Sequence, residues 1–290
     1  MARLPVYLRS MHFIKEHIAR SGADMVVNFY ELLTGLAYAL YRIPTPQVCI
    51  GHQYLFLHHD FRFPKKSLPG LWGLKFFTRL TCIGAKKKLA LSFHAMDEDV
   101  KEDIRVVPPL LRKEVFRCEC SEGDYVHGYM VNSGFAESVR EWHALHPDVP
   151  LRFFWDKRGE KTVRREDDTL SFYPLNDVEF LRQMSGCRAY ASTAGFESIC
   201  EAMYLCKPVL MVPAHIEQDC NAFDAASNGA GIVSDSFELD RLLAFAEQYV
   251  PDVRFRTWVE SAPYMICYAL DPDAYKHQAS DHMYMVEEFT

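Results

Sequence analysis

The chain has 290 residues, of which 49% are hydrophobic, 13% aromatic and 24% charged, a composition that disfavours the fibrous, repeat and disordered classes. Its 32 basic and 39 acidic side chains give a formal net charge of −7, so no nucleic-acid partner is expected. The positive charge is concentrated between residues 54 and 88, where eight basic side chains accompany one acidic one.

The nine cysteines are distributed along the chain, and several lie within apolar helical or strand patterns. Thiols in such places behave as small buried hydrophobic groups. Residues 1–10 contain two arginines and no long apolar run, so no secretion signal is expected, and no window is apolar over the length that crosses a bilayer. We therefore expect free thiols and a cytoplasmic protein.

In the first part of the chain, short β-rich runs alternate with amphipathic stretches, the pattern of a parallel sheet covered by helices. The predicted elements are a helix over 6–21, a strand over 25–28, a helix over 32–41, a strand over 47–50, a helix over 71–80 and a strand over 88–93. A doubly wound domain usually opens with a strand, whereas this series opens with a helix. We therefore expect the opening βα unit of this domain to be missing.

Residues 103–116 carry Pro108 and Pro109 between short apolar runs, and a polar segment follows. Paired prolines remove two backbone donors and fix an extended path, which is typical of a linker. We place a domain boundary here, with an N-terminal domain over 1–117 and a C-terminal domain over 118–290.

The second series is longer and more regular, with strands of four to seven residues separated by helices of about 10 to 15 residues, as in βαβ units. Its predicted strands are 125–131, 151–155, 169–173, 188–192, 208–212 and 231–234, and its predicted helices are 135–145, 177–184, 195–205, 217–228 and 236–249. The last ~30 residues are aromatic-rich and helical in pattern, and we expect them to pack back on the N-terminal domain.

The most informative segment runs from Cys187 to Ile232. A strand stops at Ser192-Thr193, turns through Ala194-Gly195 and enters a helix that holds Ser198 and Glu201. Ligands of open parallel sheets bind at the carboxyl ends of strands, where helix N-termini offer unpaired N–H groups and partial positive charge. The pattern indicates a phosphate at the helix start, with Glu201 placed to accept hydrogen bonds from a sugar hydroxyl pair.

The next strand is followed by Pro213 and by the adjacent pair Glu217-Gln218. A carboxylate next to an amide at a helix start is suited to reading the hydroxyls of a hexose. Because both helices follow strands of one parallel sheet, both sites are expected at the same edge.

These two elements, TAGFESICE followed by P-x-x-x-E-Q-x-x-N-A, are similar to the donor-binding signature of GT-B nucleotide-sugar glycosyltransferases. The resemblance is to the family-28 type, which includes the peptidoglycan N-acetylglucosaminyltransferase, and to the UDP-glycosyltransferases. It covers most of residues 118–250. It implies an α/β protein of GT-B fold, with two Rossmann-like domains containing parallel sheets. The segment Cys206-Lys207-Pro208 departs from the usual Gly-x-Pro.

The resemblance also implies roles for single residues. Gly195 matches the glycine at the helix start, Ser198 a phosphate-contacting serine and Glu201 the carboxylate that binds the ribose. The remaining donor-binding positions are Thr193, which stands where some relatives have a phosphate-contacting histidine, Ala194 in the same turn, the sugar-reading pair Glu217 and Gln218, and Asn221. Such enzymes commonly bind the diphosphate without a metal, and no cofactor is expected.

Two residues of the first domain are candidates for the catalytic base. His52 and Glu31 each follow a predicted strand, and a histidine or a carboxylate can take the proton of an acceptor hydroxyl. A purely structural role is the alternative for both. The run His58-His59-Asp60 suggests a metal site, but adjacent residues seldom converge on one ion without partners elsewhere, so we expect no metal there.

The basic stretch over 54–88 interleaves its charges with large apolar side chains. That combination suits a segment lying on anionic lipid, at the inner face of the membrane. The lipid-linked acceptors of family-28 enzymes make this interpretation attractive. The alternative is that most of the aromatic residues are core and the lysines a solvated rim.

The sequence therefore predicts a glycosyltransferase that transfers a hexose from a nucleotide-diphosphate sugar, a UDP-sugar in our interpretation, to an unknown acceptor with inversion. Two alternatives stay open. One is a non-catalytic nucleotide-sugar-binding protein, and the other is a UDP-sugar 2-epimerase, although the acid and histidine pattern of an epimerase is not found.

Overall fold

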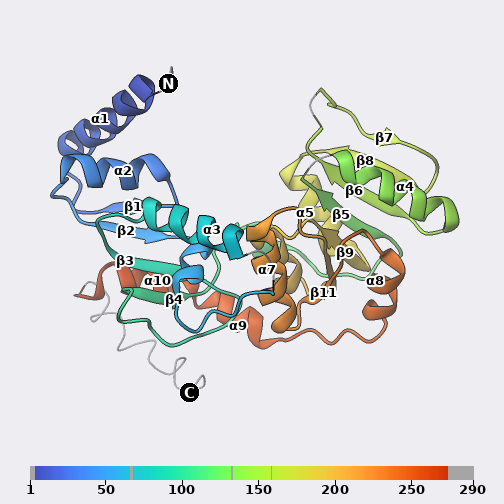
Figure 1. Ribbon diagram of the computed structural model, residues 1–290. Helices are drawn as coiled ribbons and strands as arrows, with labels where there is room; N and C mark the ends of the chain where they lie inside the picture. Colours follow the sequence, from blue (N-terminus) through green and yellow to red (C-terminus); the bar gives the residue numbers. More distant parts are fainter. Residues whose placement is uncertain (1–3, 66–67, 132, 158, 274–290) are drawn as a thin grey trace. The chain divides into compact units, whose positions relative to one another are not determined.

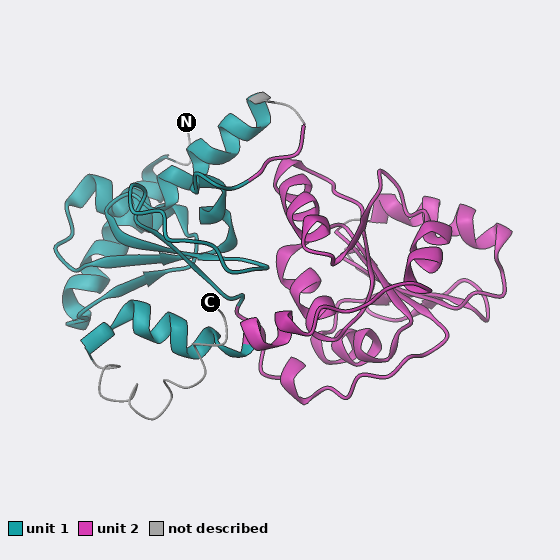
Figure 2. Cartoon of the chain, turned by 90° about the horizontal axis from the view of Figure 1, so that it is seen from below, with its two compact units in different colours: residues 1–61, 67–109, 260–290 teal, residues 62–66, 110–259 magenta. Residues whose placement is uncertain are grey.

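The computed structural model describes residues 4–65, 68–131, 133–157 and 159–273 (Figure 1). The chain divides into two compact units (Figure 2). Among the described residues, unit 1 takes those of Met1–Phe61, Ser67–Pro109 and Glu260–Thr290, and unit 2 takes those of Arg62–Lys66 and Leu110–Val259. Each unit is built around its own sheet.

Unit 1 contains a four-stranded parallel sheet in the order β1-β2-β3-β4. Its strands are β1 (Val26–Asn28), β2 (Gln47–Ile50), β3 (Ala85–Leu91) and β4 (Ile104–Val107). Its helices are α1 (Leu4–Ser21), α2 (Leu32–Tyr41), the 3-10 helix η1 (His52–Leu57), α3 (Leu68–Thr81) and α10 (Ala262–Leu270). The helices and strands predicted before residue 93 are all present, within three residues at their ends.

Helix α2 shows how local chemistry sets these elements. Glu31 caps its start, because a side-chain oxygen accepts from Thr34 N at 2.9 Å. A Cβ on Gly35 would lie 2.3 Å from the carbonyl oxygen of Leu80, so only glycine lets α2 approach the end of α3 this closely. The cap fixes the start of α2, and the close approach at Gly35 lets α2 pack against α3.

The segment 103–116, predicted as a linker, begins with a strand, β4, that was not predicted. Ile104, Val106 and Val107 are buried, and β4 pairs in parallel with β3 from Lys88↔Ile104 to Leu91↔Val107. β-branched side chains favour a strand, and the prolines that follow end it because they cannot donate to the ladder. The change of unit falls between Pro109 and Leu110, whereas the sequence placed the boundary near residue 118.

The segment after residue 260 belongs to unit 1, and α10 contacts β4. The Arg105 guanidinium of the β4 strand lies 5.8 Å from the ring centre of Tyr268 in α10, a distance at which a cation and an aromatic ring attract. The prediction for the last ~30 residues extends to 290, of which those beyond 273 lie outside the described residues.

Unit 2 contains a seven-stranded sheet in the order β11-β10-β9-β5-β6-β8-β7. Its strands are β5 (Val126–Met130), β6 (Leu151–Trp155), β7 (Arg164–Arg165), β8 (Leu170–Pro174), β9 (Ala189–Ser192), β10 (Val209–Met211) and β11 (Gly231–Val233). The helices of this part of the chain are η2 (Val115–Arg117), η3 (Ser133–Phe135), α4 (Ala136–Leu145), α5 (Asp177–Gly186), α6 (Phe196–Tyr204), α7 (Ile216–Ser227), α8 (Leu239–Ala246) and α9 (Arg254–Glu260).

All strands of this sheet are parallel except β7, which pairs antiparallel with β8 and was not predicted. Without β7 the order is that of a doubly wound Rossmann sheet, with β5 at the centre and the winding reversing between β5 and β9. The core around it is aromatic, and the Trp155 ring stacks on Phe172 at 4.4 Å. All nine cysteines are free, as predicted.

Candidate functional site

The predicted donor-binding residues gather at one edge of the unit 2 sheet. Strands β9 and β10 are parallel neighbours, and helices α6 and α7 begin within a few residues of their carboxyl ends. This edge lies beside the point between β5 and β9 where the winding reverses, which is where open α/β sheets bind ligands. The topology therefore brings the two sequence elements together.

The turn after β9 is hydrogen-bonded to the end of β5 through the backbone and side chain of one residue, Thr193. Thr193 is fully buried, its N–H donates to Tyr129 O at 3.3 Å, and its Oγ1 accepts from Val131 N at 3.2 Å. Thr193 therefore joins the ends of two strands across the reversal point. The next residue, Ala194, has a φ of +60°, a left-handed conformation that costs a non-glycine residue about 1 kcal/mol or more.

Helix α6 starts with an open backbone. Gly195 is its N-cap and supplies no side-chain cap. The φ of Gly195 is −69°, and a Cβ there would meet only Ser198 Oγ, at 3.6 Å. Neither strain nor crowding within the described residues therefore demands glycine at this position. The missing side chain leaves the helix start accessible to a ligand that seeks backbone N–H groups.

Ser198 lies half-buried in the first turn of α6, and its Oγ donates to the Gly195 carbonyl oxygen at 3.1 Å. A hydroxyl rotates freely and can donate elsewhere. The side chain is thus placed at the helix start where the sequence put it, and a bound anion would compete with the carbonyl for its hydrogen.

Glu201 is buried, with 5% of its surface exposed. Its two carboxylate oxygens accept from Arg112, Oε1 from Nε at 2.5 Å and Oε2 from Nη2 at 2.7 Å. This bidentate bond raises the pKa of Arg112. A ribose could therefore bind Glu201 only through lone pairs that Arg112 leaves, or after Arg112 moves.

Arg112 was missed by the sequence reasoning. It lies beside Lys113 in a short irregular segment, and nothing in its local pattern marks it. Its Nη1 lies 3.9 Å from an Asp177 carboxylate oxygen at the start of α5, and its guanidinium carbon lies 5.9 Å from the ring centre of Phe180. These contacts fix the group that holds Glu201.

Helix α7 begins at the carboxyl end of β10, and its N-cap His215 makes no side-chain cap. Glu217 lies half-buried in the first turn. Gln218 is buried and its Oε1 accepts from Ala214 N at 2.9 Å. This bond spans the helix start and fixes the amide, so that its NH₂ group is the part left to meet a ligand.

Asn221 connects the two elements. It is 2% exposed, and its Nδ2 donates to the carbonyl oxygen of Ala194 at 3.2 Å. Its Oδ1 is buried with no hydrogen-bond partner among the described residues. A buried amide oxygen of this kind is costly, and it lies at the strained turn that begins α6.

One turn further along α7, Asp224 is buried, and no ion pair joins it to a cation in the described part of the chain. Its Oδ1 accepts from Asn228 at 3.1 Å, and its Oδ2 has no partner in the described part of the chain. Burial raises the pKa of this carboxyl from 3.8 to about 7. The sequence reasoning did not single out this residue, since Asp at that helical position has no distinguishing spacing.

The two candidate bases of unit 1 lie after neighbouring parallel strands, Glu31 after β1 and His52 after β2. Glu31 is exposed and caps α2. His52 is 2% exposed, its Nδ1 lies 2.7 Å from Leu91 O, and its ring packs against Phe56 and Phe93. Glu31 is accessible to a substrate as it stands, whereas His52 is held within the unit.

The basic, aromatic stretch over 54–88 divides between core and surface. Its large apolar side chains that are buried, among those described, are Tyr54, Leu55, Phe56, Leu57, Phe61 and Leu71. In contrast, α3 exposes Trp72 at 74%, Phe76 at 65% and Phe77 at 41%. Within the described part of the chain, no helix combines the length and apolar character needed to span a bilayer.

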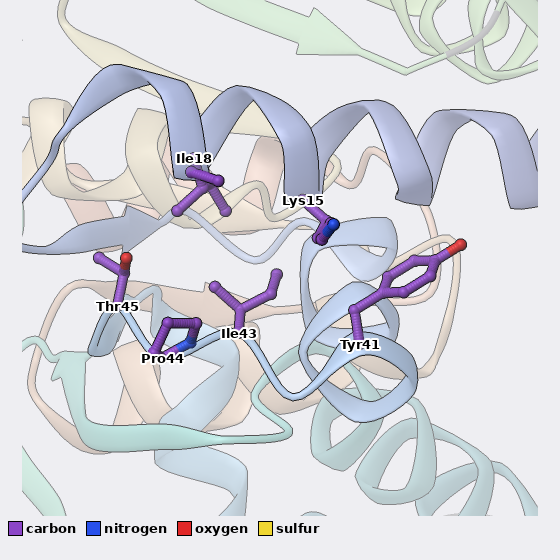
Figure 3. Close-up of a pocket in the computed structure, with 7 residues that line it drawn as sticks. Lys15, Ile18, Tyr41, Ile43, Pro44 and Thr45 are labelled. Atoms are coloured by element: carbon purple, nitrogen blue, oxygen red, sulfur yellow. The ribbon is translucent and has the colours of Figure 1, made fainter.

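A small apolar pocket of about 70 Å³ lies elsewhere in unit 1. Lys15 and Ile18 of α1 lie over Ile43, Pro44 and Thr45, which lead into β2 (Figure 3). This is the amino end of the strand, opposite the edge where α/β sheets bind ligands. The pocket is therefore not part of the candidate site.

Comparisons with known proteins agree with this geometry. The family model described as "Glycosyl transferase family 1" matches residues 2–250. No curated protein sequence matches the chain.

Many solved structures share the fold. UGT2 of Phytolacca americana, complexed with UDP-2-fluoro-glucose and pterostilbene, has a TM-score of 0.57 at 13% identity, over 88% of this chain and 75% of its own. The spinosyn rhamnosyltransferase SpnG, complexed with thymidine diphosphate, has a TM-score of 0.57 at 11% identity, and the match covers 92% of this chain and 78% of SpnG. UGT89C1 of Arabidopsis thaliana, complexed with UDP-L-rhamnose, has a TM-score of 0.52 at 16% identity, and the match covers 96% of this chain and 75% of UGT89C1. The predicted GT-B fold is thereby confirmed.

Proposed function

Because this chain belongs to glycosyl transferase family 1, we propose that it transfers a hexose from a UDP-linked donor to an acceptor hydroxyl with inversion. The observation that carries the proposal is the pair of helix starts, α6 and α7, at adjacent strand ends beside the reversal point of the sheet. Two uncapped helix starts can bind anionic oxygens through backbone N–H groups and helix dipoles.

In the proposed complex, the diphosphate lies at the start of α6, over Gly195 and beside the hydroxyl of Ser198. Glu201 contacts the ribose, with Arg112 orienting its carboxylate. Glu217 and Gln218 contact the hydroxyls of the sugar. The buried Asn221 supports the turn through its bond to Ala194. Structural relatives crystallised with UDP-sugars or thymidine diphosphate support a nucleotide-diphosphate donor.

The proposed reaction is a single displacement. The acceptor oxygen forms a bond to the anomeric carbon while the bond from that carbon to the diphosphate oxygen breaks. The leaving diphosphate takes the bonding electrons and is stabilised by the α6 N-terminus and Ser198. The acceptor proton passes to a base, for which Glu31 and His52 are the candidates. The role proposed for the helix start needs no metal ion.

We further propose that the acceptor is reached at a lipid surface. Trp72 and Phe76 are exposed one turn apart on α3, and the same helix carries Lys75 and Arg79. Aromatic side chains with basic neighbours on one helix suit an anionic membrane surface. This agrees with a lipid-linked acceptor and with a cytoplasmic protein that binds the inner face of the membrane.

The donor site is tested by calorimetric titration of the full chain with UDP, UDP-sugars and inorganic pyrophosphate. We expect Glu201→Ala to weaken UDP binding by about tenfold or more and pyrophosphate binding much less, since a lost charged hydrogen bond costs roughly 1.5–3 kcal/mol. Equal binding of UDP by the variant and the parent would contradict the ribose assignment.

Turnover is measured separately with radiolabelled UDP-sugars and candidate acceptors. Label in the acceptor supports transfer, and the configuration of the product reports inversion. UDP-sugar binding without transfer or hydrolysis would instead identify a non-catalytic binder. Conversion of the UDP-sugar to its C2 epimer, in the absence of an acceptor, would identify an epimerase.

A further inference from the structure

Two histidines and an aspartate from distant parts of unit 1 meet outside the site described above. His58 and His59 directly follow η1, and Asp99 lies in the connection between β3 and β4. One possible ligand atom from each lies within 4.8 Å of the others. The sequence reasoning discounted His58-His59-Asp60 because a partner from elsewhere was lacking, and the fold supplies Asp99 as that partner.

His58 has one ring nitrogen occupied in a way that suits a metal ligand. The side chain is buried, and its Nε2 lies 2.9 Å from the carbonyl oxygen of Asp97. A carbonyl only accepts, so Nε2 carries the hydrogen and Nδ1 keeps the lone pair. Histidines that bind metals usually donate their second nitrogen to a carbonyl or carboxylate in this manner. The present partner of Nδ1 is Asp60 N, at 3.2 Å.

His59 is arranged in the same way with a carboxylate as its second partner. Its Nδ1 lies 2.9 Å from Asp99 Oδ2, and its Nε2 lies 3.2 Å from Asp60 Oδ2. A cation between Nδ1 and Asp99 would leave Nε2 to donate to Asp60, a carboxylate–histidine–metal arrangement. In such an arrangement Asp60 would position His59 and would not be a ligand.

Asp99 is fixed before any ion binds. The side chain is 3% exposed, and its Oδ1 accepts from the backbone N–H groups of Lys101 and Glu102 at 3.1 and 3.2 Å. Its Oδ2 is directed to His59. The carboxylate thus presents one oxygen to the cluster, while the other belongs to the loop.

We propose that His58, His59 and Asp99 bind a zinc ion, with His58 Nδ1, His59 Nδ1 and Asp99 Oδ2 as its ligands. Two imidazoles and a carboxylate form a nitrogen and oxygen ligand set that zinc accepts. Tetrahedral bonds of about 2.0–2.1 Å place ligand atoms about 3.3 Å apart, whereas the candidate atoms now lie within 4.8 Å of one another. The rings of His58 and His59 are stacked, with an interplanar angle of 13°, so the exposed His59 ring would have to turn out of the stack for both imidazoles to point to one ion. The exposed side, where His59 is 60% accessible, leaves the fourth position to water.

The ion would connect the loop after η1 to the β3–β4 connection, so its effect is on stability. The inference is independent of the proposed glycosyl transfer. It is tested on chelator-treated full-length protein by calorimetric titration with Zn²⁺ and by thermal unfolding with and without Zn²⁺. We expect one bound ion and an increase in Tm, because an ion that binds only the folded state stabilises it.

His59→Gln is the main variant because that side chain is exposed and can be replaced without damage to the core. We expect it to weaken Zn²⁺ binding by more than about tenfold and to remove the Tm increase, and Asp60→Asn to weaken binding by about tenfold. The control is His17→Gln, an exposed histidine on α1, which should bind Zn²⁺ like the parent.

A Co²⁺ titration tests the coordination of the ion directly. Four-coordinate Co²⁺ absorbs visible light much more strongly than the aqueous ion does. Asp99→Asn should lose that spectrum even where circular dichroism shows a folded protein. Zn²⁺ binding that is equal in the parent and in His59→Gln, or a Co²⁺ spectrum of the aqueous ion, would overturn the proposal and leave the His59–Asp99 contact as an ion pair only.

Discussion

Arg112 and Glu201, 89 residues apart in the chain, form a bidentate ion pair with N···O distances of 2.5 and 2.7 Å. The carboxylate is buried and the guanidinium is 29% exposed. Glu201 lies in the second turn of α6, the helix that begins at the predicted phosphate-binding turn. The pair therefore sets the orientation of the carboxylate that we assign to the ribose.

The pair predicts an asymmetric pattern of stability. Arg112→Gln leaves a buried carboxylate without its cation, so we expect the free energy of unfolding to fall by about 1–3 kcal/mol, a range reduced because Arg112 is partly exposed. The double variant Arg112→Gln with Glu201→Gln removes the unpaired charge and should lose less. Urea unfolding of the three proteins checks this order. A double variant less stable than Arg112→Gln would contradict it.

The strand–turn–helix elements around Gly195 could be predicted because each depends on short-range pattern: apolar runs, small residues at a turn and helical spacing. The segment around Ile104 was misjudged because Pro108 and Pro109 suggested a linker, whereas burial of three apolar side chains outweighs them. The partners of Glu201 and His59 could not be predicted. Arg112 and Asp99 are brought to them by the tertiary fold, and a pairing across 89 or 40 residues leaves no local signal.

Gly195→Ala separates ligand binding from stability. Its Cβ would meet only Ser198 Oγ, at the ordinary distance of 3.6 Å, so we expect a change in stability below about 0.5 kcal/mol. The added methyl group would occupy the space over the helix start, and we expect the Kd for UDP to rise by about tenfold. Calorimetry and urea unfolding measure the two effects on the same preparation.

Gly128→Ala is the contrasting variant. There a Cβ would lie 2.2 Å from the Phe153 ring, so stability should fall by about 1–3 kcal/mol. UDP affinity in the folded fraction should be unchanged, because Gly128 is in the middle of β5. A Gly195→Ala protein that binds UDP as well as the parent does would refute the assignment of the helix start to the diphosphate.

The exposed aromatic side chains of α3 predict lipid binding that is separable from folding. Trp72→Ser with Phe76→Ser should reduce sedimentation with vesicles of anionic phospholipid severalfold, because each buried aromatic contributes about 1.5–3 kcal/mol. Vesicles of neutral phospholipid should bind weakly to both proteins. The control is Phe13→Ser, a substitution of an aromatic residue that is 64% exposed on α1. Equal losses in the control and the α3 variant would exclude α3 as the binding face.

Asp224 predicts a decrease in stability as the pH rises. Its pKa is about 7 in the folded protein, raised by burial from 3.8, so between these values the folded state holds a proton that the unfolded chain has released. The free energy of unfolding must then fall as pH increases from 4 to 7, by roughly 4 kcal/mol from this group at about 1.4 kcal/mol per pH unit. Its contribution is constant above the folded pKa.

Asp224→Asn removes that titration while keeping an oxygen that can accept from Asn228. We expect the variant to unfold less readily than the parent at pH 8 and to show little advantage at pH 4, so the difference in the free energy of unfolding should grow with pH. Urea titrations of both proteins at pH 4, 6 and 8 measure the difference directly, and the other titrating groups cancel in it. A difference that is independent of pH would show that Asp224 ionises at its ordinary pKa.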